Sequence, residues 1–215
     1  MRDDLTDITV VLDRSGSMES CRQEAENGLN HFIEEQAKRP GEALFSLMQF
    51  DTEYEMVHRG IPIGKVPKCA VVPRGMTALL DAVGRAIRET GLRLHNMPED
   101  ERPGLVLFVI ITDGLENSSH EFNCDQIKQM IEHQKLVYSW QFTFLGANQD
   151  AFAEAGKMGI DPDDAACYSA SAPDVAFSAA AGKLGRMRDM QRRGEKIASA
   201  FTLEERDAMK PKSSK

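Results

Sequence analysis

Short, strongly apolar runs alternate along the chain with longer segments in which apolar residues recur every three or four positions. Many of the runs are rich in β-branched residues, as in strands that are buried on both faces of a sheet. They predict strands at residues 8–12, 43–51, 54–58, 105–111, 139–145 and around 167–168. The longer segments have the period of amphipathic helices. They predict helices at residues 18–38, 77–90, 123–137, 149–158 and 173–193.

This alternation predicts a doubly wound α/β fold, in which helices cover both faces of a mostly parallel sheet. One pair of strands should differ. Only two residues separate the strands at 43–51 and 54–58, which is too short for a crossover helix, so these strands should be antiparallel. The 215 residues suit one domain. We expect it to span residues 1–206 and to be followed by a disordered basic tail at 207–215.

The sequence argues against a membrane span and against a secretion signal. No apolar run approaches the roughly 20 residues that a membrane span requires. The start, from Met1 to Asp4, has neither the apolar core nor the cleavage site of a signal peptide. Four cysteines stand more than forty residues apart, which excludes a C-x-x-C zinc or redox motif. We therefore expect a cytoplasmic protein with free thiols in packing roles.

Charge is unevenly distributed along the chain. There are 26 Lys and Arg against 34 Asp and Glu, a net charge of −8. Residues 173–215 hold ten basic and six acidic residues, a net charge of +4, so residues 1–172 carry −12. Such an acidic body would repel a phosphate backbone over most of its surface, so general nucleic-acid binding is not expected.

Side chains with oxygen atoms gather where a doubly wound sheet binds its ligands, beyond the carboxyl ends of the strands. Five of them stand after a strand or before a helix: Asp13, Ser15 and Ser17 after the first strand, Thr77 before a helix, and Asp113 after the most apolar strand. Two carboxylates and three hydroxyls form the all-oxygen donor set that Mg²⁺ and other hard cations prefer.

Each of these residues alone also has an ordinary structural explanation. Ser15, Ser17 or Thr77 could be the N-cap of a following helix. Asp113-Gly114 is a common turn pair. The metal hypothesis therefore depends on the three segments occurring together.

The order and spacing Asp13-x-Ser15-x-Ser17, then Thr77, then Asp113-Gly114, resemble the metal-ion-dependent adhesion site (MIDAS) of von Willebrand factor type A domains, found also in integrin I domains. The resemblance covers about residues 5–193 and is to stand-alone, intracellular proteins of bacteria or bacterial viruses. It implies a Rossmann-like, mostly parallel sheet of six strands, with one short antiparallel edge strand and helices on both faces.

The same resemblance implies the roles of the site residues. Ser15 and Ser17 would bind Mg²⁺ or Mn²⁺ directly. Thr77 would bind it directly or through water, whereas Asp13 and Asp113 would act through water. One position is left for an outside ligand, typically an Asp or Glu carboxylate of another protein. The function implied is a non-enzymatic binding module, with partners such as AAA+ ATPases, kinases, phosphatases or assembly components.

Two alternatives stay open on the sequence: a Mg²⁺-dependent hydrolase acting on a phosphate or an ester, and a structural subunit with a vestigial metal site. The G-x-S-x-G elbow and the phosphate-binding P-loop motif are both absent. Arg14 could clamp a ligand carboxylate or face water. Glu116 could alter the charge of the site or belong to an ordinary exposed loop. Met18 and Met76 flank the metal residues and could line a ligand groove.

Overall fold

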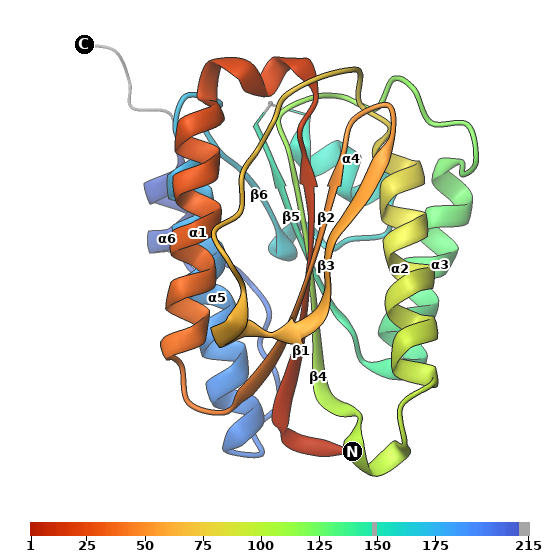
Figure 1. Cartoon of the computed structure of the whole chain (residues 1–215), viewed down its shortest axis with the longest axis vertical. Coiled ribbons are helices and arrows are strands. Elements are labelled where there is room, and N and C mark those ends of the chain that lie inside the picture. The colour runs from red at the N-terminus through yellow and green to blue at the C-terminus, as the bar shows by residue number, and fades with distance from the viewer. Residues whose placement is uncertain (148–149, 211–215) are drawn as a thin grey trace.

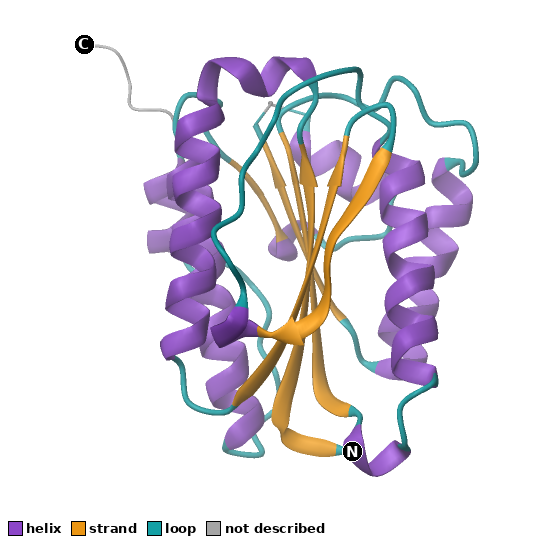
Figure 2. Cartoon of the chain, in the orientation of Figure 1, coloured by secondary structure: helices purple, strands orange, loops and turns teal. Residues whose placement is uncertain are grey.

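The computed structural model describes residues 1–147 and 150–210. Its centre is a six-stranded sheet with the strand order β3-β2-β1-β4-β5-β6. The strands are β1 (Arg2–Asp13), β2 (Glu42–Phe50), β3 (Tyr54–Pro62), β4 (Pro103–Thr112), β5 (Gln141–Gly146) and β6 (Ala165–Cys167). β2 and β3 are antiparallel and the other neighbours are parallel (Figure 2). The expected mostly parallel sheet with an antiparallel edge strand is confirmed.

Helices cover both faces of this sheet. They are α1 (Arg22–Lys38), α2 (Leu79–His95), α3 (Cys124–Tyr138), α4 (Ala151–Lys157), α5 (Pro173–Arg192) and α6 (Leu203–Met209). Helices α1, α5 and α6 pack on one face, and α2, α3 and α4 pack on the other (Figure 1). The fold is therefore doubly wound, as the sequence pattern predicts.

Alternate residues of the central strand β4 point to opposite faces, so each face has its own core. Leu107, Val109 and Ile111 belong to the core under α1 and α5. Phe108 and Ile110 belong to the core under α2 and α3. All five are buried, and burial of each such side chain contributes about 1.5–3 kcal/mol. A shift of one residue in the pairing register of β4 would exchange the side chains of the two faces. This packing therefore fixes the position of the strand's carboxyl end.

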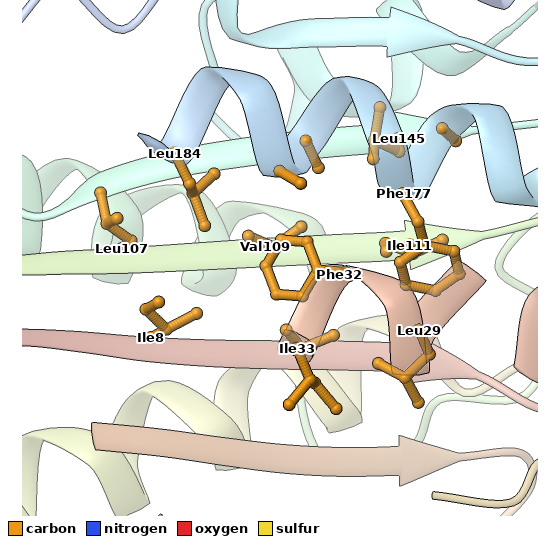
Figure 3. Packing of buried hydrophobic residues seen from close by; sticks show 14 of the residues in the cluster. Ile8, Leu29, Phe32, Ile33, Leu107, Val109, Ile111, Leu145, Phe177 and Leu184 are labelled. Atoms are coloured by element: carbon orange, nitrogen blue, oxygen red, sulfur yellow. The ribbon is translucent and has the colours of Figure 1, made fainter. Parts of the chain in front are cut away.

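The first core is formed by α1, α5 and the central strands (Figure 3). The ring centroids of Phe32 in α1 and Phe177 in α5 are 6.4 Å apart. Gly28 allows the two helices to approach closely, because a Cβ at this position would lie 2.6 Å from Cδ2 of Phe177. This contact holds α1 in place, and α1 directly follows the segment that contains Asp13, Ser15 and Ser17.

Several elements differ in extent from the sequence expectation. Strand β1 starts at Arg2 rather than at residue 8, and α2 spans Leu79–His95 rather than residues 77–90. The helix expected at 18–38 starts as a 3₁₀ helix at Gly16–Cys21 and becomes α-helical at Arg22. The 3₁₀ turn forms because the N–H of Met18 bonds to the carbonyl of Ser15, three residues back. Strand β3 extends to Pro62, past the expected end at residue 58, because it pairs along most of β2.

Helix α6 has no counterpart in the expected elements. A capping box starts it: the Thr202 hydroxyl accepts a hydrogen bond from the N–H of Glu205, and the Glu205 carboxylate accepts one from the N–H of Thr202. The helix continues to Met209, so the expectation of a disordered tail from residue 207 is wrong for its first residues. Residues 211–215 of that tail lie outside the described residues.

Residue 149, the expected start of the helix at 149–158, also lies outside the described residues, and α4 begins at Ala151. The four cysteines form no disulfide in the described part of the chain, as expected. None of the described helices is long and apolar enough to cross a membrane.

Candidate metal centre

The sheet brings the ends of β1 and β4 together. These strands are parallel neighbours, with Leu12 paired with Ile111. Asp13 is the last residue of β1 and Thr112 is the last residue of β4. Both ends lie at the edge of the sheet that Figure 1 shows at the top, where the loops that follow the strands meet. Residues that follow the two strands are therefore neighbours in space.

Hydrogen bonds connect the predicted site residues of these two ends. The hydroxyl oxygens of Ser15 and Ser17 are 3.0 Å apart. Ser17 donates to Oδ1 of Asp113 at 2.8 Å. Asp13 accepts two bonds, at Oδ1 from the Ser15 N–H (2.7 Å) and at Oδ2 from the Thr112 hydroxyl (2.6 Å). Four of the five predicted residues thus form one connected group, oriented by Thr112.

Thr77 joins this group from the loop before α2. Its N–H donates to the side-chain oxygen of Asn117 at 2.9 Å, and its carbonyl accepts from the N–H of Asn117 at 3.1 Å. Its hydroxyl lies beside the residue that follows Asp113, since a Cβ on Gly114 would be 2.9 Å from Oγ1 of Thr77. The structure therefore brings all five predicted residues together. Asn117, in the loop after β4, holds the Thr77 backbone through two hydrogen bonds, a role that the sequence did not suggest.

The capping explanation is wrong for Ser15 and for Thr77. Ser15 precedes the 3₁₀ helix, but its side chain makes no capping hydrogen bond in the described structure. The N-cap residue of α2 is Ala78, not Thr77. The first N–H groups of α2 are bound instead by the loop after β4: Leu80 donates to Oε2 of Glu116 at 2.9 Å, and Asp81 donates to Oγ of Ser119 at 3.1 Å.

Glu116 therefore has a structural role. Its Oε1 accepts bonds from the N–H groups of Ser118 and Ser119, and its Oε2 also accepts from the hydroxyl of Ser119. The carboxylate lies at the positive end of α2, where a negative charge is favourable. Glu116 fastens the loop that carries Asp113 to the helix that follows Thr77, so neither expectation for it, an altered site charge or an ordinary exposed loop, describes it fully.

The two carboxylates of the group share an unfavourable environment. Burial raises the pKa of Asp13 to about 6, the neighbouring Asp113 adds to this rise, and hydrogen bonds from Thr112 and Ser15 oppose it. Burial likewise raises the pKa of Asp113. No Lys, Arg or His among the described residues forms an ion pair with either one. Two carboxyl groups thus lie close together, and neither forms an ion pair with a basic side chain of the described residues.

The donor set distinguishes this site from one built mainly on acidic, histidine or cysteine ligands. Within residues 1–147 and 150–210 there is no group of three or more His, Cys, Asp or Glu that could hold a metal. Here hydroxyls supply the remaining oxygens: Ser15 and Thr77 are buried, and Ser17 is exposed. The arrangement fits a small hard cation that binds oxygen and is reached from the Ser17 side.

No protein-family model and no curated protein sequence matches the chain. Solved structures do resemble it. Proximal thread matrix protein 1 from the mussel byssus has 15% identity over 86% of this chain and 46% of its own, with a TM-score of 0.63. A von Willebrand factor type A structure from Catenulispora acidiphila has 13% identity over 85% and 42%, with a TM-score of 0.58. Manganese-loaded TRAP protein from Plasmodium vivax has 14% identity over 82% and 73%, with a TM-score of 0.54.

The chain has the von Willebrand factor A fold. It spans less than half the length of the mussel and Catenulispora chains. The mussel protein is also known with a zinc-occupied MIDAS motif. In this von Willebrand factor A fold, the candidate metal centre lies at the carboxyl ends of the strands, where open α/β sheets bind ligands.

Arg14, inside the MIDAS-like motif of this von Willebrand factor A fold, does not face water. It is 5% exposed, and its guanidinium pairs with Asp51 at 2.8 Å and with Glu55 at 2.7 Å. The expectation that Arg14 faces water is therefore wrong. Its guanidinium is already paired with two carboxylates of this chain, which disfavours the role of a clamp for a ligand carboxylate. Charge patterning gave no signal for this pairing, because Asp51 directly follows β2 and Glu55 lies in β3, 37 and 41 residues away.

The two methionines beside the motif have different positions. Met18 is fully buried and packs with Cys21 and Ala25, so it lines no groove on the surface. Met76 is 54% exposed and directly precedes Thr77. Of the two, only Met76 is available to a molecule that approaches the candidate centre.

Proposed function

We propose that this domain is a metal-dependent protein-binding module whose MIDAS-like site holds Mg²⁺ or Mn²⁺. One observation carries the proposal: Asp13 and Asp113 converge with three hydroxyls but have no positive partner among the described residues. Buried or half-buried carboxylates are costly unless a cation compensates them. A divalent cation is the partner that suits an all-oxygen group of this size.

The proposed roles follow the donor chemistry. Ser15 and Ser17 would hold the ion directly, Thr77 directly or through water, and Asp13 and Asp113 through water. Three neutral hydroxyls add no negative charge, so the bound ion supplies strong attraction for an anionic oxygen from outside. The carboxylates balance part of the charge and orient the ligands, as outer-shell groups do in metal sites.

The outside ligand that we propose is an Asp or Glu carboxylate of another protein. Ser17 is exposed, so the site is open to an approaching side chain. Partner classes consistent with this function include AAA+ ATPases, kinases, phosphatases and assembly components. We propose that these contacts occur in the cytoplasm of a bacterium or of a phage-infected cell.

We propose binding without catalysis. A serine nucleophile requires a positioned base, which is itself oriented by a third group. Ser15 bonds to Ser17, and Ser17 donates to Asp113. No histidine, lysine or cysteine in the described part of the chain bonds to either hydroxyl. The absence of turnover with phosphate and ester substrates in Mn²⁺ would support this proposal, and turnover that Asp13→Ala abolishes would overturn it.

Calorimetric titration with Mg²⁺ and with Mn²⁺ tests the metal site. We expect binding to one site in the wild type and at least about tenfold weaker binding in Thr77→Ala and Asp113→Asn. Asp100→Asn is the control, because Asp100 is an exposed acid away from the candidate site. No binding by the wild type would identify the site as vestigial.

A peptide display library, panned once with Mn²⁺ and once with a chelator, tests the proposed ligand. We expect the peptides that require Mn²⁺ to share an Asp or Glu. Exchange of that residue for Asn or Gln should abolish binding, and Thr77→Ala protein should not capture the peptides. Metal-dependent peptides that contain no acidic residue would contradict the proposed ligand chemistry.

A further inference from the structure

A buried ion pair includes Arg14, which stands between two of the candidate metal residues in the chain. Arg14 and Asp51 are 5% and 2% exposed. The Arg14 Nε lies 2.8 Å from Oδ2 of Asp51, and the same oxygen accepts a bond from Arg74 at 2.9 Å. Arg14 lies between Asp13 and Ser15, whereas Asp51 directly follows β2. The pair therefore connects the metal-binding segment to the neighbouring strand.

The same two segments hold the loop that carries Thr77. The N–H of Arg74 donates to the Arg14 carbonyl at 2.9 Å, and the N–H of Ala78 donates to the Asp51 carbonyl at 3.0 Å. Between them, the N–H of Met76 donates to the Thr52 hydroxyl at 2.9 Å. Residues on both sides of Thr77 are thus tied to Arg14, Asp51 or the residue after it.

Gly75 completes this attachment. Its φ is +67°, a left-handed conformation that favours glycine. A Cβ there would lie 2.7 Å from the Thr52 hydroxyl and 3.2 Å from Oδ1 of Asp51. The Gly75 carbonyl also accepts a bond from the N–H of Gly16, at 3.2 Å. The loop therefore lies in close contact with the Asp51 side chain and with the Ser15–Ser17 segment.

Stability alone explains this pair poorly. Taking two charges out of water costs several kcal/mol per ion, so a buried pair is weak evidence for stability. Nη2 of Arg14 is also buried and has no hydrogen-bond partner within the described structure, which adds to the cost. What the pair does provide is a fixed distance between the β1 end and the loop that carries Thr77.

We propose that Arg14 and Asp51 are positioning residues, which hold the Thr77 loop against the Ser15–Ser17 segment at the separation that metal binding requires. This inference rests on the proposed function of the site. Neither residue touches the ion or its outside ligand. Both act through the backbone of residues 74–78, and through it on the hydroxyl of Thr77.

The test compares two buried ion pairs, one directly after the end of β1 and one that includes a residue within β1. Asp51→Asn removes one charge of the pair, and Arg14→Met/Asp51→Leu removes both, so that neither buried charge is left without its partner. The side chains that then lose a contact, Glu55 and Arg74, are exposed to solvent. The control is Arg93→Met/Asp7→Leu. Asp7 is fully buried in β1 and pairs with Arg93 of α2 at 2.8 Å, six residues before Asp13. All variants are measured in the full chain, with thermal melting as the check of folding.

Mn²⁺ titration is the first readout. We expect about tenfold to 100-fold weaker Mn²⁺ binding in both Asp51 variants, which is the range seen for residues that support metal ligands. In the control we expect less than about a twofold change. In a Thr77→Ala background, Asp51→Asn should cause no further loss, because it acts through Thr77. Wild-type affinity in both Asp51 variants, or an undiminished loss in that background, would overturn the proposal.

Hydrogen exchange in a chelator is the second readout, and it needs no metal. The amides of residues 74–78 should exchange several-fold faster in both Asp51 variants and should be unchanged in the control. Unchanged exchange would overturn the positioning role even if Mn²⁺ binds to the wild type. If exchange is faster in both Asp51 variants but the wild type binds no Mn²⁺, the result supports the positioning of the loop and overturns the proposed function.

Discussion

Ser17 and Asp113 share a hydrogen bond of 2.8 Å across 96 residues of sequence. The bond exists because β1 and β4 are parallel neighbours whose ends coincide. A serine hydroxyl can bind a metal ion through the lone pairs of its oxygen while its O–H donates a hydrogen bond to a carboxylate. The bond therefore arranges both side chains in advance. It uses the proton of Ser17 and a lone pair of Asp113 Oδ1, and it does not itself occupy the lone pairs of the Ser17 oxygen.

Asp13→Asn should stabilise the metal-free protein while it weakens metal binding. Burial raises the pKa of Asp13 to about 6, so the ionised carboxylate opposes folding at neutral pH. In a chelator, we expect a higher urea midpoint for the variant than for the wild type. Mn²⁺ should then stabilise the wild type by the greater amount. A variant that is less stable in chelator would show that Asp13 contributes to the fold through its hydrogen bonds to Ser15 and Thr112.

Metal affinity should fall in acid. Between the ordinary value of 3.8 and about 6, native Asp13 holds more proton than unfolded Asp13 does. Without metal, its contribution to stability therefore falls as the pH rises through this window. Protons compete with the cation for the group, so Mn²⁺ binding should weaken as the pH drops below about 6. Calorimetry across this range checks the result, and an affinity that does not change with pH would contradict it.

Gly114→Ala should weaken metal binding without unfolding the protein. Gly114 has no left-handed backbone conformation, but its added Cβ would lie 2.9 Å from Oγ1 of Thr77. The hydroxyl must move, and we expect a loss of Mn²⁺ affinity of about tenfold or more. The matched control is Gly91→Ala in α2, where a Cβ meets nothing within 4 Å. That change should raise stability by about 0.5–1 kcal/mol and leave Mn²⁺ affinity unchanged.

Lys183 should give the protein a separate alkaline dependence. It is fully buried in α5, 3.0 Å from Asp164 and 4.2 Å from the ring of Phe201. Burial lowers its pKa from 10.5 to about 8. Between these values the unfolded chain holds more proton, so wild-type stability should rise with pH relative to Lys183→Met. Urea unfolding of both proteins measures the difference, and a constant difference from about pH 7 to pH 10 would contradict it.

Local patterns were sufficient to predict a mostly parallel sheet and to place the candidate residues at one edge of it. The apolar run at Leu105–Ile111 is long enough to identify a central strand, and the two-residue link before Tyr54 identifies the antiparallel pair. Once parallel strands are assigned, Asp13 and Asp113 must lie at the same edge. Its position before a helix placed Thr77 near the same edge, but its contacts with Asn117 and beside Gly114 could not be predicted, because they depend on the conformation of the loop that contains Gly75.

Other features depend on contacts between distant segments. Arg14 is paired with Asp51 and Glu55, and no spacing in the sequence indicates these partners. Glu116 binds the start of α2 for the same kind of reason. Helix α6 is different, because Thr202-x-x-Glu205 is a capping box that could have been recognised from the sequence. The helix has few apolar residues, so the periodicity of an amphipathic helix is weak in this segment.

A crystal grown with Mn²⁺ tests the central claim most directly, because the anomalous signal of manganese locates the ion independently of the protein atoms. We expect one peak within coordination distance of the Ser15 and Ser17 hydroxyls, next to Thr77, with Asp13 and Asp113 around it. A map with no peak among these five side chains, or with manganese bound only elsewhere, would contradict the account.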